Sequence, residues 1–224
     1  MFLRTGELKK IMKSSLKSSG LIVGNIREKY LVYADSWGLS TECCYASNKF
    51  KAAIMELIGD LPENGECYLF TINSDKEVVA QAEMGYPDPF EEWKSAKDFA
   101  VTTPVSIFAW PHEFIVFQKK SDLGFVTALR SLTKDVISDS ELDSKIEHRP
   151  GRPSIKDGNI LYWKNETTIY WVHTESAGNK ANDVLFPHLD GMSFFEDNWL
   201  VNEDQEDEES EENKEAAGEE SLPY

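Results

Sequence analysis

The chain has 224 residues, of which 41% are hydrophobic, and a formal net charge of −17 at pH 7. This size and apolar content suit one globular domain with a real core, and no run of about 18 apolar residues predicts a membrane-spanning helix. The lysine-interrupted N-terminus does not resemble a secretory signal, and three cysteines, two of them adjacent, favour a reducing cytoplasm over a disulfide framework.

The first half of the chain predicts two helices and five strands. Residues 6–18 place apolar side chains on one helical face and lysines around the other, and a second helix runs from an N-cap at Ser47 or Asn48 to Gly59. The strands are rich in Val, Ile, Tyr and Thr and are separated by turn-forming residues. They lie at residues 21–26, 30–35 and 38–46, which predict an antiparallel meander, and at 67–73 and 77–83, which predict a hairpin.

The second half predicts two more helices and four strands. Asp88 is the N-cap of a short helix that ends near residue 99, and Ser121 is the N-cap of a longer helix with apolar residues at positions 125, 128, 129, 132 and 136. Residues 138–157 are polar and predict a loop, and the aromatic segment 176–201 is expected to fold back onto the core. The strand pairs lie at 105–109 with 114–118, and at 159–163 with 167–174.

This mixture of elements predicts the α+β class. Helices and strands do not alternate in βαβ units, so we expect a mainly antiparallel sheet or a small OB-like barrel, with three to four helices. We expect residues 1–201 to form a single globular domain. Residues 202–224 carry eleven acidic side chains and one lysine. A segment this charged buries too little apolar surface to fold, so we expect a disordered acidic tail.

No motif in the sequence predicts catalysis, a metal site or a cofactor. The chain has no glycine-rich phosphate loop and no GxSxG turn, and its four histidines are scattered without HExxH or CxxC spacing. Asp88, Glu92 and Lys94 imitate the acidic residues and lysine of metal-dependent nucleases, but Asp88 also serves as a helix cap. We therefore expect a protein that is not an enzyme and that uses no cofactor.

Basic and aromatic residues near the N-terminus predict a nucleic-acid-binding surface. Single-stranded nucleic acid is bound by a positive groove with aromatic rings on which bases stack. The residues of this kind are Lys9 and Lys13 on the first helix and Arg27, Lys29, Tyr30 and Trp37 on the first strands. The alternative is that Tyr30 and Trp37 belong to the core.

An arginine- and proline-rich motif lies in the predicted loop. Residues 149–153 read Arg-Pro-Gly-Arg-Pro. This motif resembles the Gly-Arg-Pro core of minor-groove hooks, in which an arginine enters an A/T-rich groove. Pro150 stands where those hooks usually have an arginine, so a rigid surface loop is the alternative.

The end of the tail carries a second pattern. After the acidic run, Glu219 and Glu220 are followed by Ser221 and the apolar tip Leu222-Pro223-Tyr224. An acidic tail with an aromatic tip resembles the tails of bacterial and bacteriophage single-stranded-DNA-binding proteins, in which acidic residues commonly precede Ile-Pro-Phe. The resemblance covers the tail alone. It implies that the tail competes with DNA for the binding groove and recruits replication or repair proteins through Glu219, Glu220, Leu222, Pro223 and Tyr224.

Three functions are open at this point. The first is a DNA replication or recombination accessory of the single-stranded-DNA-binding type, with single-stranded DNA as its ligand and a tail that recruits partner proteins. The second is an acidic protein-binding module, such as an immunity, inhibitor or DNA-mimicking protein that acts on a nucleic-acid enzyme, because residues 1–201 are themselves net acidic. The third is a ring-forming DNA processivity factor, which the basic first helix followed by paired strands would suit.

Overall fold

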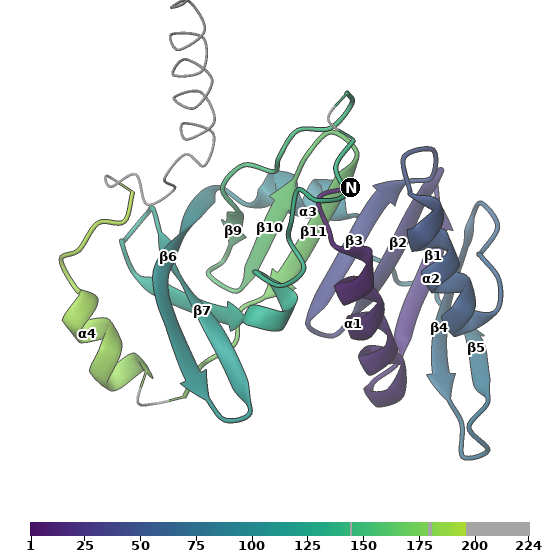
Figure 1. The fold of residues 1–224 in the computed structure, drawn as a ribbon, viewed down its shortest axis with the longest axis horizontal. Helices are drawn as coiled ribbons and strands as arrows, with labels where there is room; N and C mark the ends of the chain where they lie inside the picture. The colour runs from purple at the N-terminus through teal and green to yellow at the C-terminus, as the bar shows by residue number, and fades with distance from the viewer. Residues whose placement is uncertain (144, 179–180, 196–224) are drawn as a thin grey trace, which may run out of the picture.

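The computed structural model describes residues 1–143, 145–178 and 181–195 of the protein, and an antiparallel sheet runs through this part (Figure 1). From one edge to the other, its eleven described strands are β5 (Val78–Ala82), β4 (Glu66–Ile72), β1 (Leu21–Ile26), β2 (Lys29–Ala34), β3 (Trp37–Glu42), β11 (Thr168–His173), β10 (Ile160–Lys164), β9 (Ser154–Lys156), β6 (Asp98–Ala109), β7 (His112–Lys119) and β8 (Phe125–Leu129). No pairing between described residues joins β5 to β8, so this sheet is open and is not the closed form of a small barrel. The α+β class and the mainly antiparallel sheet are confirmed.

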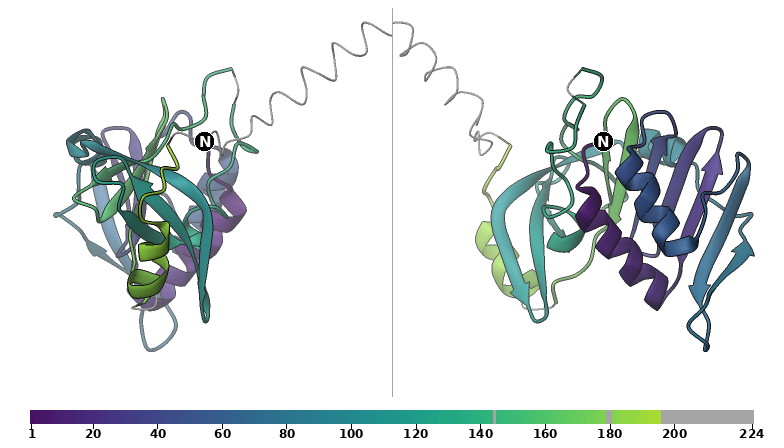
Figure 2. Two further views of the ribbon diagram at one scale, coloured as in Figure 1. Left: turned by 90° about the vertical axis from the view of Figure 1, so that its left-hand side faces the viewer. Right: turned by 45° about the vertical axis from the view of Figure 1, so that its right-hand side comes forward.

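Two helices, α1 (Thr5–Ser18) and α2 (Asn48–Ile58), lie side by side on one face of the sheet and form what we call the helix layer (Figures 1 and 2). Ser47 caps α2 by accepting a hydrogen bond from the backbone N–H of Phe50 at 3.2 Å, as predicted. No helix in the described part of the chain has the length and apolar character needed to cross a membrane. The apolar side chains that the helices bury recur at helical spacing and are Leu8, Met12 and Leu16 on α1 and Phe50, Ala53 and Ile54 on α2.

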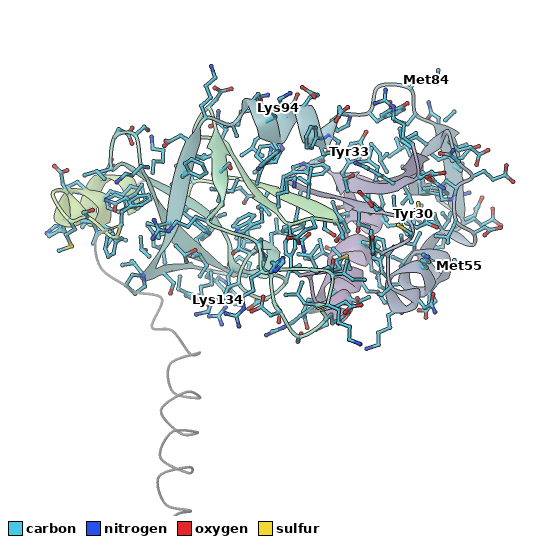
Figure 3. All side chains as sticks on the ribbon, turned by 90° about the horizontal axis from the view of Figure 1, so that it is seen from above. Tyr30, Tyr33, Met55, Met84, Lys94 and Lys134 are labelled. Carbon is cyan, nitrogen blue, oxygen red and sulfur yellow. The ribbon has the colours of Figure 1, made fainter. Side chains whose placement is uncertain are left out.

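The opposite face of the sheet, here called the second face, carries a short helix, α3 (Pro89–Ser95). Asp88 caps this helix as predicted. Its Oδ1 accepts hydrogen bonds from the backbone N–H of Phe90 at 3.1 Å and from that of Glu91 at 3.3 Å. The helix ends at Ser95 and not near residue 99, because β6 begins at Asp98. In the view from above, Lys94 of α3 and Met55 of α2 lie on opposite sides of the sheet (Figure 3). The side chains beneath α3 are Leu31, Tyr162, Ile169 and Trp171.

The helix predicted from Ser121 is wrong, because residues 125–129 form the edge strand β8. A 3-10 turn (η1, Arg130–Leu132) follows the strand. The apolar spacing of this segment suits either a helix or a strand, but its valine and threonine favour extended backbone. On one side of β8, the edge of β7 supplies backbone hydrogen-bond partners for its residues. On the other side, the N–H of Glu175 donates to the carbonyl of Thr127 at 2.8 Å.

Three strand predictions also differ from the structure. The strand predicted at residues 105–109 is the end of β6, which begins at Asp98. The third strand ends at Glu42 and not at residue 46, because residues 43–46 turn towards the start of α2. The polar segment 138–157, predicted as a loop, ends in the short strand β9, which pairs with β10 and β6. A three-residue strand has too little periodicity to be seen in the sequence, and only its neighbours in the sheet define it.

The described C-terminal segment folds back onto the sheet, as expected. It contains a π-helical turn (η2, Ala181–Leu185) and α4 (Phe186–Leu189), and the ring of Phe194 lies 6.2 Å from that of Phe125. Gln118, fully buried in β7, holds this segment: its Nε2 donates to the carbonyl of Met192 at 2.7 Å and its Oε1 accepts from the N–H of Phe194 at 2.8 Å. Trp199 and the predicted tail, residues 202–224, lie outside the described residues.

Candidate nucleic-acid interface

The helix layer is a positively charged surface on an acidic protein. α1 and α2 together hold six lysines and only two glutamates. Lys9 binds Glu56 across the two helices, and Lys10 binds Glu7 at 2.7 Å, so both glutamates are engaged. Four lysines of these helices form no ion pair with any described residue: Lys51, which is half-buried, and the exposed Lys13, Lys17 and Lys49. Exposed ammonium groups of this kind can contact nucleic-acid phosphates without reading sequence.

Tyr30 and Trp37, the two rings predicted to stack on bases, are core residues. Tyr30 is 7% exposed, and its ring meets that of Phe50 edge-on at a centroid distance of 6.4 Å. Trp37 is 1% exposed and donates its indole N–H to Oγ of Ser15 at 3.0 Å, which joins β3 to α1. Neither ring offers a face to a base in this structure, which corrects the stacking role that the sequence suggested.

Arg27 and Lys29 lie away from the helix layer. Arg27 occupies the tight turn between β1 and β2 with a φ of 52°, and its exposed guanidinium is 3.8 Å from the carboxylate of Asp88. Side chains alternate along a strand, so Lys29 lies on the second face with Leu31, while Tyr30 points to the helix layer. The six residues predicted to line one groove are therefore divided among the helix layer, the core and the second face.

The segment that joins β5 to β6, residues 83–97, crosses the second face and is here called the strap. Trp93 anchors it by packing on the sheet, and Nζ of Lys164 lies 4.9 Å from the centroid of the Trp93 ring. Glu92 of the strap also binds Lys156 of β9. The strap is therefore held against the sheet by both apolar and charged contacts.

A cavity of about 350 Å³, here called the strap cavity, lies on one side of the strap. It brings Arg27 and Lys29 together with two partly exposed rings of the strap, Tyr86 and Phe90. Neither ring is among the predicted functional residues, although two aromatic residues flanking the prolines and the acid of residues 87–89 are a signal for an exposed aromatic segment. Asp88 and Glu91 also line the strap cavity, so its charge is balanced.

A second cavity of about 340 Å³, here called the aromatic cavity, lies on the other side of the strap. Tyr33, Tyr162 and His173 are among its lining residues. Desolvation raises the pKa of Tyr162 to about 12 and also raises the pKa of Tyr33. Burial lowers the pKa of His173, although nearby carboxylates oppose this. These side chains are thus largely uncharged at pH 7. The cavity offers flat apolar surface and neutral hydrogen-bonding groups, with Asp35 and Glu92 among its lining residues, which is the chemistry of a binding surface.

The tip of the β6–β7 hairpin exposes two large rings. Phe108 is 70% exposed and Trp110 is 84% exposed. Phe108 lies in a predicted strand and Trp110 just beyond it, and neither is among the predicted functional residues. The signal in the sequence is an aromatic residue beside Pro111 between two predicted strands. Exposed rings of this size mark a surface that contacts other molecules.

The nuclease-like set is not assembled as a site. Asp88 is engaged as the cap of α3, Glu92 binds Lys156, and Nζ of Lys94 lies 3.9 Å from the carboxylate of Glu91. No group of three or more His, Cys, Asp or Glu residues within the described ranges is placed to hold a metal ion.

The chain was also compared with known proteins. No model of a protein family, no curated protein and no solved structure matches it.

Proposed function

We propose that the protein is a non-enzymatic accessory of DNA replication or recombination. In this proposal it holds DNA by its phosphates on the helix layer and recruits replication or repair proteins through residues 202–224. We place it in the cytoplasm because three unpaired cysteines suit a reducing compartment.

The observation that carries the proposal is the separation of charge. The protein has a net charge of −17, yet the outer side of the helix layer holds three exposed lysines without an ionic partner among the described residues, Lys13, Lys17 and Lys49. Basic residues gathered on one side of an acidic protein need a polyanionic partner to explain them, because a solubilising surface would mix the two charges. We infer that the bound form is single-stranded DNA because the acidic run and the Leu-Pro-Tyr tip of the tail resemble those of single-stranded-DNA-binding proteins.

The test is fluorescence anisotropy of labelled oligo(dT), measured over a series of salt concentrations. Each lost phosphate contact lowers the slope of log affinity against log salt by about 0.7 for single strands. The triple variant Lys13→Gln/Lys17→Gln/Lys49→Gln is expected to bind more weakly and to lose roughly two units of this slope. Removal of residues 202–224 should strengthen binding, because the acidic tail no longer competes with phosphates.

The matched control is Arg27→Gln/Lys29→Gln, which removes positive charge from the second face. It is expected to bind oligo(dT) as the wild type does. Equal losses in the control and the triple variant, or binding that does not respond to salt, would overturn the assignment to the helix layer.

The ring-forming processivity factor is a second candidate, favoured by the open sheet. All five residues of β5 are exposed and none is charged, and its outer backbone groups have no strand beside them in the described part of the chain. Uncharged edge strands pair readily with another chain, which is how sheets of neighbouring subunits become continuous in a ring. Light scattering after size exclusion tests this candidate: a stable oligomer that Val79→Lys converts to monomers supports it, and a monomeric wild type excludes it.

A further inference from the structure

A cavity of about 410 Å³ on the β6 side of the molecule plays no part in the proposed DNA contacts. Its floor is apolar and is formed by the buried side chains of Val101, Trp163 and Phe194. Its rim includes the Arg-Pro-Gly-Arg-Pro motif of residues 149–153. This motif has no role in the proposed binding of DNA to the helix layer. We call it the arginine cavity.

The arginine cavity is built into the fold. The pairing of β6 with β7 shifts register between Thr102 and Ser106, and Pro104, which has no N–H, lies at this irregularity. Thr103 stabilises the distortion, because its Oγ1 donates to the carbonyl of Val116 at 2.9 Å and accepts from the N–H of Val105 at 3.2 Å. The regular pairing of β6 with β7 is thus interrupted beside the cavity.

The opposite wall, from the loop that carries the arginines, is also fixed. The N–H of His148 donates to the carboxylate of Glu166 at 3.0 Å, and its carbonyl accepts from Nδ2 of Asn165 at 3.1 Å. At the last residue of the motif, the carbonyl of Pro153 accepts from the N–H of Ala100 at 2.9 Å. Both ends of residues 149–153 are therefore tied to the sheet, so the cavity exists before any ligand binds.

Its charge distinguishes the arginine cavity from the aromatic cavity. Arg149 and Arg152 line it with a single acid, Asp139, which binds Arg149. The aromatic cavity is instead lined by Asp35 and Glu92. An apolar floor beneath two arginines suits a peptide that has apolar side chains next to carboxylates.

The tail of this chain has that chemistry. Glu219 and Glu220 precede Leu222-Pro223-Tyr224, so two carboxylates stand beside three apolar side chains. The chain also begins its course to the tail beside the cavity: Phe194 lines it, and the guanidinium of Arg152 lies 5.5 Å from the ring centroid of Phe195. Residues 196–218 separate this point from Glu219, and a random-coil chain of that length spans roughly 25 Å on average, which would give an effective concentration of about millimolar.

We propose that the tip of the tail docks in the arginine cavity of its own chain. Leu222, Pro223 and Tyr224 occupy the apolar floor, and Glu219 and Glu220 lie against the two arginines. A docked tip is withheld from partner proteins, so a partner must compete with the cavity for the same residues. The inference does not depend on DNA binding by the helix layer.

The test uses amide NMR spectra of the full chain and three variants. In Arg149→Gln/Arg152→Gln, the signals of residues 219–224 should move to the positions found for a free synthetic peptide of residues 211–224. In a chain without residues 222–224, the signals of residues 101–104 and 149–153 should shift, while those of α1 stay in place. The charge-matched control is Lys13→Gln/Lys17→Gln, whose tail signals should match the wild type.

The peptide supplies a second readout. Added to the chain that lacks residues 222–224, it should restore the wild-type positions of residues 149–153, and the arginine variant should bind it about tenfold more weakly or worse. A peptide of the same composition with the Leu-Pro-Tyr tip moved to its middle tests for charge attraction alone and should not restore them.

Three outcomes would overturn the proposal. They are tail signals in the wild type that already match the free peptide, equal effects of the two peptides, and shifts that depend on protein concentration. The last of these would place the tip in a second copy of the chain.

Discussion

Gly38 lies directly beneath the indole of Trp171, its antiparallel partner across β3 and β11. A Cβ at position 38 would lie inside van der Waals distance of three atoms of the indole, so only glycine leaves room for the ring. The aromatic cluster under the strap therefore depends on a residue that has no side chain.

We expect Gly38→Ala to lower the free energy of unfolding by about 1–3 kcal/mol, because the indole or the strand must move. Urea denaturation followed by tryptophan fluorescence measures this change. The control is Gly6→Ala on α1, where nothing lies within 4 Å of the added Cβ and alanine favours the helix by up to about 1 kcal/mol. Equal destabilisation by both substitutions would contradict the steric explanation.

Ser15→Ala tests the assignment of Trp37 to the core. The substitution leaves the buried indole N–H of Trp37 without its acceptor, so we expect stability to fall by about 1–3 kcal/mol. Binding of oligo(dT) at 25 °C should be unchanged, because both side chains are buried between α1 and the sheet, away from the exposed lysines. A variant that folds with wild-type stability but binds DNA poorly would instead return Trp37 to the binding surface.

Stability should fall as the solution becomes mildly acidic, in part through His173. Burial lowers the pKa of His173 below the ordinary value of 6.5 that it has in the unfolded chain. As the pH falls through 6.5, the unfolded chain takes up this proton more readily, so the contribution is complete above that pH and is lost below it. Thermal unfolding at about pH 7.5 and about pH 5.5 should show a smaller loss of Tm in His173→Gln than in the wild type; identical losses would show that His173 does not contribute.

The strap should loosen when its anchor is removed. Trp93→Ala deletes the side chain that packs on the sheet, so we expect faster hydrogen exchange and faster chymotryptic cleavage within residues 83–97 while the helix layer keeps its protection. Met84→Ala is the control, because Met84 is almost fully exposed. If Trp93→Ala accelerated exchange across the whole sheet, the strap would be part of the cooperative core.

Local signals in the sequence predicted much of the fold. Ser47 and Asp88 each offer an oxygen to the first turn of a helix, and a cap of this kind acts within a few residues, so both helix starts were found. The strands β1, β2, β4 and β10 were likewise found to within a residue or so from their composition. The helix predicted over β8 failed because its conformation depends on the free edge of β7, which is a tertiary partner.

The candidate site was predicted less well, for a geometric reason. Strand alternation separates Lys29 from Tyr30, but it does not say which of them faces the helices. That choice follows from where α2 places Phe50, far along the chain. The lysines of α1 were predicted because a basic helical face is a local pattern. The neighbours of residues 149–153 come from β6, which is distant in the sequence, so no local pattern predicts them.

Gln118 has a mechanical consequence for everything that follows it. Its amide holds Met192 and Phe194 from inside β7, so the last described residues are fixed beside the arginine cavity. Gln118→Leu would remove these two bonds and leave the segment held by the contacts of the Phe186 and Phe194 rings with Phe125. A looser attachment of this segment would lower the effective concentration of the tip at the cavity and so weaken its proposed docking. A single buried amide therefore helps to set the effective concentration on which the proposed docking of the tip depends.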